Sequence, residues 1–296
     1  MHKVILYCKS YKGDLDRIKI LNESIKRYNS DKIPFYVSCP KSDFDFFKNE
    51  IDGISLISDE DIMGKEFEQS WYSQQLVKLN FYKTKIAENY VVIDSDSYFI
   101  KNFYYSDFID QKGNPFFVCF EDKLFFEFLV RRKLSFVIDG AKNSFGEIAN
   151  FFGRNDKALY TFGSPCIWNF HVLESLEKRL NEDGCDFEKM INISPYEMNW
   201  YGEFLLSNPD FRFRSIGPLA KVYHYQIFYE EERILGQSKE NLSENYIMVI
   251  MQNKWVKDDV FKSSFFGILM NYLRNISFSK NKKRIKKMKN KRFFKR

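Results

Sequence analysis

The first hundred residues alternate between two hydrophobic patterns. Short apolar runs over Lys3–Cys8, Ile33–Ser38 and Ile54–Ile57 have the length and composition of buried strands. Between them, apolar residues recur every three or four positions over Asp14–Tyr28, and a shorter helix is expected over Lys41–Asn49. This β-α-β-α-β order predicts a parallel sheet with right-handed crossovers.

The next helix and strand lead to a pair of aspartates. Trp71–Ala87 carries apolar residues along one helical face, and the apolar strand Tyr90–Ile93 follows it. Asp94 and Asp96 stand directly after that strand. Ligands of open α/β sheets bind beyond the carboxyl ends of the strands, so the two aspartates are where a ligand is expected.

The pattern becomes mixed after Pro115. Leu124–Arg154 is expected to be helical in part. We further predict strands over Phe116–Phe120 and Tyr160–Asn169, helices over Val172–Leu180 and Tyr196–Leu206, and strand runs within Phe211–Tyr229. The sequence therefore predicts one α/β domain over residues 1–250 and an appended segment over residues 251–296.

Composition and cysteine usage narrow the class of protein. The 296 residues are 44% hydrophobic, which is enough for one sizeable core. The five cysteines are scattered without CxxC spacing, so neither a disulfide framework nor a zinc site is indicated. The N-terminus enters a strand at once, and the apolar run Phe265–Met270 is too short to span a bilayer. A cytoplasmic protein is the expectation.

Charge is distributed unevenly along the chain. Twelve of the 46 Lys and Arg lie at or after Arg274, and no Asp or Glu follows Asp259, so the body carries 34 basic against 40 acidic residues. An apolar helical stripe over Phe261–Ile276 precedes the basic run. This arrangement favours a peripheral anchor on the anionic inner face of a membrane. A solvated disordered terminus and a nucleic-acid arm are the alternatives, and we expect no nucleic-acid partner.

Asp94 and Asp96 carry the main chemical signal. Residues i and i+2 of a strand point to the same side, so two carboxylates there repel each other unless a cation lies between them. A hard divalent ion such as Mn²⁺ or Mg²⁺ takes oxygen ligands of this kind together with phosphate oxygens of a substrate. Such an ion offsets the charge on a departing diphosphate. A plain turn after the strand is the alternative structure.

Two rival functions remain open. A strand followed by DxD also occurs in haloacid-dehalogenase-like phosphatases, where Asp94 would be the nucleophile. That motif opens its domain, whereas three predicted strands precede it here. The other rival is a non-catalytic, membrane-associated scaffold that acts through its basic tail.

Several further residues are candidates for ligand contacts. His224 lies in a late strand-like run and would complete the metal shell, although a packed structural histidine is the alternative. In the loop after the first strand, Tyr11 would stack on a nucleotide base and Lys9 would reach ribose or phosphate. That loop also reads as a helix start with Asp14 as its N-cap.

Two helices supply the remaining candidates. Gln75 and Lys78 share a helix face with Trp71, so that Gln75 would bind ribose or sugar hydroxyls and Lys78 a phosphate. Glu197, in the first turn of its helix, is the first candidate for the base that deprotonates an acceptor hydroxyl, and Glu203 is the second. The neighbouring Trp200 and Tyr201 would form a wall for stacking a sugar.

The sequence also resembles a known family. Its segments CKSYKGDLDRIKILNESIKRYN, SWYSQQLVKLN, VVIDSDSYF and SPYEMNWYGEFLL look like the DUF6492 group of bacterial GT-A-like glycosyltransferases, over roughly residues 3–230. The resemblance implies a GT-A-like fold, a nucleotide-diphosphate sugar as donor, with a UDP-sugar expected, and transfer to a glycan or lipid-linked acceptor in lipopolysaccharide or capsule assembly. The stretch YEMNWYGEF departs from the shorter E-x-Y-G pattern of the group, which leaves open which Glu is equivalent.

Overall fold

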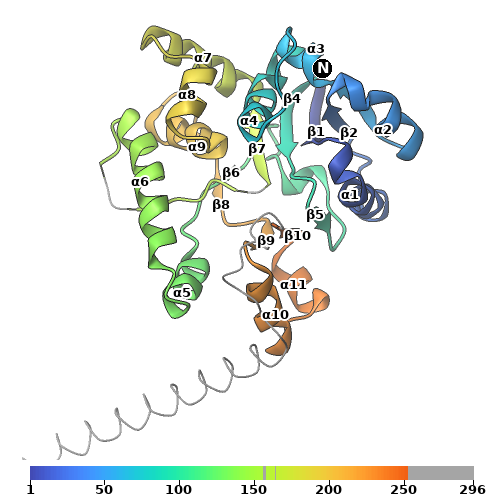
Figure 1. The fold of residues 1–296 in the computed structure, drawn as a ribbon, viewed down its shortest axis with the longest axis vertical. Helices are drawn as coiled ribbons and strands as arrows, with labels where there is room; N and C mark the ends of the chain where they lie inside the picture. Colours follow the sequence, from blue (N-terminus) through green and yellow to red (C-terminus); the bar gives the residue numbers. More distant parts are fainter. Residues whose placement is uncertain (156–157, 164, 253–296) are drawn as a thin grey trace, which may run out of the picture. The chain divides into compact units, whose positions relative to one another are not determined.

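The predicted alternation builds a five-stranded sheet in the order β3-β2-β1-β4-β7 (Figure 1). The computed structural model describes residues 1–155, 158–163 and 165–252. The sheet strands are β1 (His2–Lys9), β2 (Phe35–Cys39), β3 (Ser55–Ser58), β4 (Ala87–Val92) and β7 (Cys166–Asn169). The first four are parallel and β7 is antiparallel to β4. The expected α/β class with a mostly parallel sheet flanked by helices is thus confirmed.

Helices cover both faces of this sheet. Alternate residues of β1 point to opposite sides, so each set packs into a different core. Val4, Leu6 and Cys8 face one core, shared with α1 (Leu15–Tyr28) and α2 (Phe44–Glu50). Ile5 and Tyr7 face the other core. The helices that contribute to this second core are α3 (Asp59–Met63), α4 (Trp71–Asn80), α6 (Ser135–Phe151), α7 (Phe170–Glu182), α8 (Phe187–Ile193) and α9 (Glu197–Ser207).

Two small sheets complete the main body. One has the order β5-β10-β9, with β5 (Ser97–Phe99), β9 (Ala220–Tyr223) and β10 (Met248–Met251). The other pairs β6 (Phe117–Val118) with β8 (Ser215–Ile216). Strand β10 follows α11 (Lys239–Asn245) and runs antiparallel to β5. The Met251 N–H donates to the Asp96 carbonyl at 2.9 Å, so a late segment of the chain supports the backbone of the DxD turn.

Several element boundaries differ from the prediction. The helix expected over Trp71–Ala87 ends at Asn80, because a 3₁₀ turn follows and Lys85 takes a left-handed φ of 54° that turns the chain into β4. The strand expected over Tyr160–Asn169 is confined to β7. The short helices α3 and α8 were not anticipated, whereas α5 (Lys123–Arg131) and α6 make most of Leu124–Arg154 helical.

The chain divides into two compact units. The first comprises Met1–Val222 and Lys239–Met251, and the second includes Tyr223–Ser238 with helix α10 (Gln226–Ile234). Within the second unit the Tyr223 hydroxyl donates to Glu232 at 2.9 Å. The predicted amphipathic stripe and basic tail lie outside the described residues. No helix in the described part of the chain is long and apolar enough to cross a membrane.

Candidate functional site

The strand order reverses between β1 and β4. From β1 the chain proceeds outward through β2 and β3, and then returns to add β4 on the other side of β1. Such a switch point opens a crevice at the carboxyl ends of the two central strands, where α/β proteins bind ligands. The loop after β1 and the turn Asp94–Asp96 both leave the sheet at this point.

The loop after β1 is bonded directly to the DxD turn. Ser95 donates its hydroxyl hydrogen to Asp14 at 3.0 Å, and Arg17 donates to the other oxygen of Asp14 at 3.2 Å. Asp14 stands at the N-cap position of α1 but makes no side-chain capping bond. The capping role predicted for Asp14 is therefore wrong, and its carboxylate instead ties α1 to the turn.

The two DxD carboxylates lie in a turn rather than on a strand. The β4 ladder ends at Val92, and Ser95 and Asp96 form the turn that leads into β5. The strand geometry from which we predicted a shared side therefore does not apply. Asp94 accepts a hydrogen bond from Lys78 at 2.7 Å, whereas Oδ1 of Asp96 is buried with no hydrogen-bond partner among the described residues.

Lys78 joins three separate elements. Its side chain on α4 is only 4% exposed and forms ion pairs with Asp94 at 2.7 Å and with Glu197 at 3.2 Å. Burial disfavours the ammonium, but Asp94 and Glu197 together raise the pKa of Lys78 above its ordinary value. The structure thus brings together Lys78, Asp94 and Glu197, which the sequence predicted separately, and Lys78 remains a cation held between two carboxylates.

This cluster has more carboxyl groups than cations. Burial, followed by the charge of Asp94, raises the pKa of Asp96 to about 7, while Arg17 acts in the opposite direction. Burial likewise raises the pKa of Glu197, which Lys78 only partly counteracts. Four carboxylates face two cations, an excess of two negative charges when all are ionised: Asp14, Asp94, Asp96 and Glu197 against Arg17 and Lys78.

A divalent cation fits this charge. No set of three or more His, Cys, Asp and Glu side chains within the described residues is arranged to hold a metal ion. Asp96 nevertheless offers a buried carboxylate oxygen without a partner, next to the carboxylate of Asp94. A hard ion that keeps most of its ligands from water and substrate phosphates needs only one or two such carboxylates. The residues present therefore fit Mg²⁺ or Mn²⁺ held mainly by Asp96.

The predicted third metal ligand lies in the other unit. His224 belongs to the segment Tyr223–Ser238, and its Nδ1 is hydrogen-bonded to the side chain of Gln252 at 2.9 Å. Hydrogen bonding of this kind fixes the ring orientation of a histidine whether or not it binds a metal. The metal role of His224 stays a prediction.

At the end of β1, Lys9 is engaged with protein groups. Its ammonium pairs with Asp59 at 2.8 Å, and the side chains are 4% and 0% exposed. Tyr11, in contrast, is 46% exposed and free to meet a ligand. A Cβ at Gly13 would lie 2.4 Å from the Tyr11 ring, so the ring packs over its own loop where glycine leaves space for it. Of the two residues predicted to contact the nucleotide from this loop, only Tyr11 presents its side chain to solvent.

Three residues at this edge of the sheet were missed by sequence reasoning. Asp59 follows β3 directly, is fully buried, and has one carboxylate oxygen without a partner among the described residues. Burial raises the pKa of Asp59, and Lys9 opposes that shift. The other two missed residues are Arg17 and Asp14, and Asp14 was predicted only as a helix cap. A signal was available, because each follows the carboxyl end of a predicted parallel strand, where ligand-binding side chains collect.

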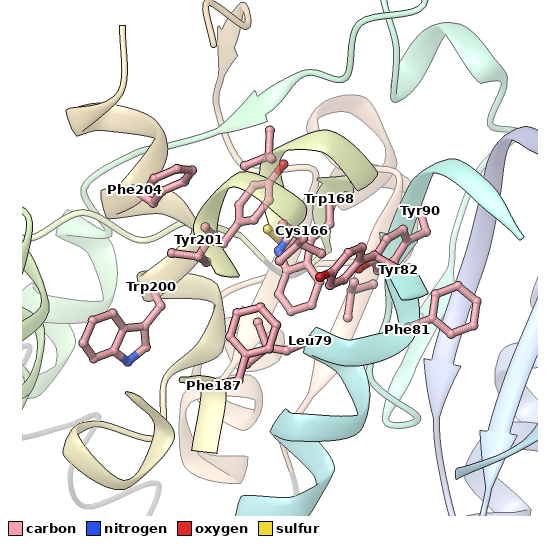
Figure 2. Close-up of a cluster of buried hydrophobic side chains, with 14 of the residues drawn as sticks. Leu79, Phe81, Tyr82, Tyr90, Cys166, Trp168, Phe187, Trp200, Tyr201 and Phe204 are labelled. Carbon is pink, nitrogen blue, oxygen red and sulfur yellow. The ribbon is translucent and has the colours of Figure 1, made fainter. Parts of the chain in front are cut away.

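The remaining candidates lie elsewhere or are buried. Gln75 is 4% exposed and donates to the carbonyl of Trp71 at 3.2 Å. Glu203 is engaged by Arg154 through two hydrogen bonds. Trp200 and Tyr201 are completely buried, and Figure 2 shows both on α9 within a cluster of buried hydrophobic side chains. The predicted sugar-stacking wall of Trp200 and Tyr201 is therefore wrong, because no ligand reaches either ring.

Comparison with known proteins assigns a family. A family model described as "Family of unknown function (DUF6492)" matches residues 3–208, more than two thirds of the chain, so the protein belongs to that family. The matched span includes the loop after β1, α4, the DxD turn and α9. No curated protein matches the chain.

Proposed function

We propose that this member of the DUF6492 family is a metal-dependent glycosyltransferase with a GT-A-like arrangement of its sheet. The observation that carries the proposal is the DxD turn at the β1/β4 switch point, which combines an unpartnered carboxylate oxygen on Asp96 with an excess of negative charge. A Mg²⁺ or Mn²⁺ ion bound there would supply positive charge to the carboxylates and would also hold the diphosphate of a nucleotide sugar. We take the donor to be a UDP-sugar, as the resemblance implies.

The chain's own residues divide the donor site between them. Asp96 would be the direct metal ligand, and Lys78 holds Asp94 in place beside it. Asp94, which is held by Lys78 on α4, is also the contact for ribose, and Tyr11 is the ring on which the base stacks. The cation, when bound, offsets the charge that develops on the diphosphate leaving group.

On the acceptor side, we assign the base to Glu197 rather than Glu203. Glu197 lies in the first turn of α9 and shares Lys78 with Asp94, and this link to the DxD turn supports the assignment. Its pKa is raised by burial, which moves a carboxyl group toward the range of an effective general base. Glu203 is neutralised by Arg154 and forms no ion pair with Lys78 in the described part of the chain.

The acceptor and the cellular location complete the proposal. A glycan or lipid-linked acceptor of the lipopolysaccharide or capsule type would be met at the inner face of the membrane. The basic tail beyond residue 253 would hold the enzyme there through anionic headgroups. We do not expect nucleic acid as a partner, since the body of the chain is acidic.

Thermal unfolding of the full chain tests the proposal. The protein is heated with UDP, GDP, ADP, CDP and dTDP, each with and without Mn²⁺. A ligand that binds only the native state raises the unfolding temperature by mass action. We expect one nucleotide to do so only when Mn²⁺ is present, and we expect Asp96→Ala to abolish that shift. Asp45→Ala, which removes an exposed carboxylate on α2, is the control that keeps it.

Other outcomes select the rival functions. The phosphatase replaces the transferase if no nucleotide shifts the transition while p-nitrophenyl phosphate is hydrolysed by the protein and not by Asp94→Asn. The scaffold replaces both if neither nucleotide nor Mn²⁺ has any effect and Asp96→Ala behaves as the parent protein.

A further inference from the structure

An exposed group of aromatic rings lies beside the charged cluster. Trp71 and Tyr72 are 44% and 48% exposed, and their rings lie 5.5 Å apart between centroids. Trp71 also contacts the half-buried Tyr196 at 6.3 Å. The other described tryptophans, Trp168 and Trp200, are completely buried, so the exposure of Trp71 is a departure that requires a reason.

Helix α4 contacts the start of α9 in two places. One is the ring contact Trp71–Tyr196, and the other is the ion pair Lys78–Glu197. Trp71 and Lys78 are seven residues apart on α4, which places them on the same face and roughly 10 Å apart along the axis. Tyr196 directly precedes Glu197. The two contacts therefore follow one another along α4. Lys78–Glu197 is the buried contact, and Trp71–Tyr196 is the contact nearer the surface.

The backbone that carries Trp71 and the ring of Tyr196 are each held by neighbouring groups. Trp71 is the first residue of α4, whose start is fixed by a capping box in which Ser73 N–H donates to Ser70 Oγ at 3.0 Å and Ser70 N–H to Ser73 Oγ at 2.7 Å. Tyr196 is supported from behind by the Phe145 ring at 5.2 Å. Preorganised rings lose little entropy when a flat ligand packs on them, which favours binding.

The chemistry of the surface favours one ligand class. No hydrogen bond within the described part of the chain uses the Trp71 indole N–H or the hydroxyls of Tyr72 and Tyr196. The surface thus combines apolar ring faces with polar groups at their edges. A pyranose ring has the matching form, with an apolar face of C–H bonds and hydroxyls around its rim. Three half-exposed rings offer about 300 Å², well short of the roughly 800 Å² per partner that a stable protein interface buries.

We infer that Trp71, Tyr72 and Tyr196 form a subsite for a sugar ring of the acceptor glycan. This inference rests on the proposed glycosyltransferase function. It replaces the buried Trp200 and Tyr201 with exposed rings on the approach to Glu197. Trp71 lies about two helical turns from Lys78 along α4, so the subsite binds the acceptor away from its reacting hydroxyl.

Saturation-transfer NMR on the full chain tests the subsite. The probes are methyl glycosides of glucose, galactose, mannose, N-acetylglucosamine and rhamnose, with their common disaccharides. We expect at least one saccharide to receive saturation on the C–H protons of a single ring face. Trp71→Ala and Tyr72→Ala should each weaken its binding roughly tenfold, the equivalent of one stacking contact. Trp71→Phe should retain part of the affinity.

The controls separate this inference from the proposed function. Tyr104→Ala removes an aromatic ring that is 43% exposed on a different loop and should leave saccharide binding unchanged. The Mn²⁺-dependent nucleotide shift should persist in Trp71→Ala. If saccharides bind through Trp71 but no nucleotide shifts the protein, the transferase fails while the saccharide site stands.

Three results would overturn the subsite. The first is that no saccharide of the panel receives saturation. The second is that binding is unaffected by both Trp71→Ala and Tyr72→Ala. The third is that phosphatidylglycerol vesicles bind the protein and lose that binding in Trp71→Ala while saccharides do not bind, which makes the rings a membrane contact instead.

Discussion

Helix α9 carries two buried glutamates whose surroundings differ in charge balance. Glu203 receives two hydrogen bonds from Arg154, whose guanidinium also lies 5.0 Å from the centre of the Tyr160 ring. Glu197 instead shares the single ammonium of Lys78 with Asp94. The first arrangement is a complete and neutral pair, whereas the second leaves negative charge uncompensated.

This difference in charge balance suggests a structural role for Glu203 and a catalytic role for Glu197. Buried charges are costly unless each has a partner, so an unbalanced cluster either takes up protons or binds a further cation from outside. The Arg154–Glu203 pair needs nothing more. The cluster around Lys78 lies at the switch point of the sheet and lacks positive charge. The same residue type, six positions apart on one helix, therefore serves two purposes.

The strongest test of this contrast removes the cation from each arrangement. Lys78→Met and Arg154→Met should each destabilise the fold by about 3–5 kcal/mol, because buried carboxylates lose their partner. Mn²⁺ should recover part of the loss in Lys78→Met by entering the acidic cluster, and none in Arg154→Met. The measurement is urea unfolding with and without Mn²⁺. Equal recovery in both variants would remove the distinction between the two sites.

Next, the two glutamates themselves should separate activity from stability. Glu197→Gln should lower turnover of the nucleotide sugar by roughly 10²–10⁴-fold, the usual contribution of a general base. Glu203→Gln should leave turnover per folded molecule unchanged and cost about 1–3 kcal/mol of stability, because the Arg154 guanidinium loses a charged acceptor. Initial rates and denaturant unfolding are measured on both proteins. Loss of turnover in Glu203→Gln alone would exchange their roles.

A smaller effect should follow from moving the helix that carries both residues. A Cβ at Gly202 would lie 2.0 Å from Cγ of Phe162, so Gly202→Ala forces α9 or Phe162 to shift and should cost about 1–3 kcal/mol. Gly146→Ala, in helix α6 with open space around it, is the matched control and should gain up to about 1 kcal/mol from helix propensity. Thermal unfolding of both variants gives the comparison. Stabilisation by Gly202→Ala would show that α9 is loosely seated.

The sequence predicted the framework of the site better than its contacts. The β1, α1 and α9 elements formed close to their expected positions, and the DxD residues stood after β4 as expected. Hydrophobic period identifies which face of an element is buried, and turn residues identify its ends. Both signals are local, so they were sufficient to place Asp94, Lys78 and Glu197 on their own elements.

Pairings across the fold could not be predicted in this way. Lys78 meets Glu197 at a separation of 119 residues, and Asp14 meets Ser95 at 81. Periodicity shows that a helix has a buried face but not which element covers it. For that reason Trp200 could not be recognised as a core residue by its type alone. Trp71 is the same residue type and is 44% exposed at the start of α4, so residue type does not distinguish the two.

The smallest expected effect concerns the bond that joins the β1 loop to the DxD turn. Ser95→Ala removes the hydrogen bond to Asp14 and should cost about 1 kcal/mol, together with part of the Mn²⁺-dependent stabilisation. Ser97→Ala is the control two residues away, because the Ser97 hydroxyl is buried without a hydrogen-bond partner in the described part of the chain. Removing an unpaired buried hydroxyl is neutral or stabilising, and it should leave the Mn²⁺ effect unchanged. Calorimetric unfolding with and without Mn²⁺ compares the two variants. If they behave alike, Asp14 is only a neighbour of the DxD turn, and the acidic cluster reduces to the carboxylates grouped around Lys78.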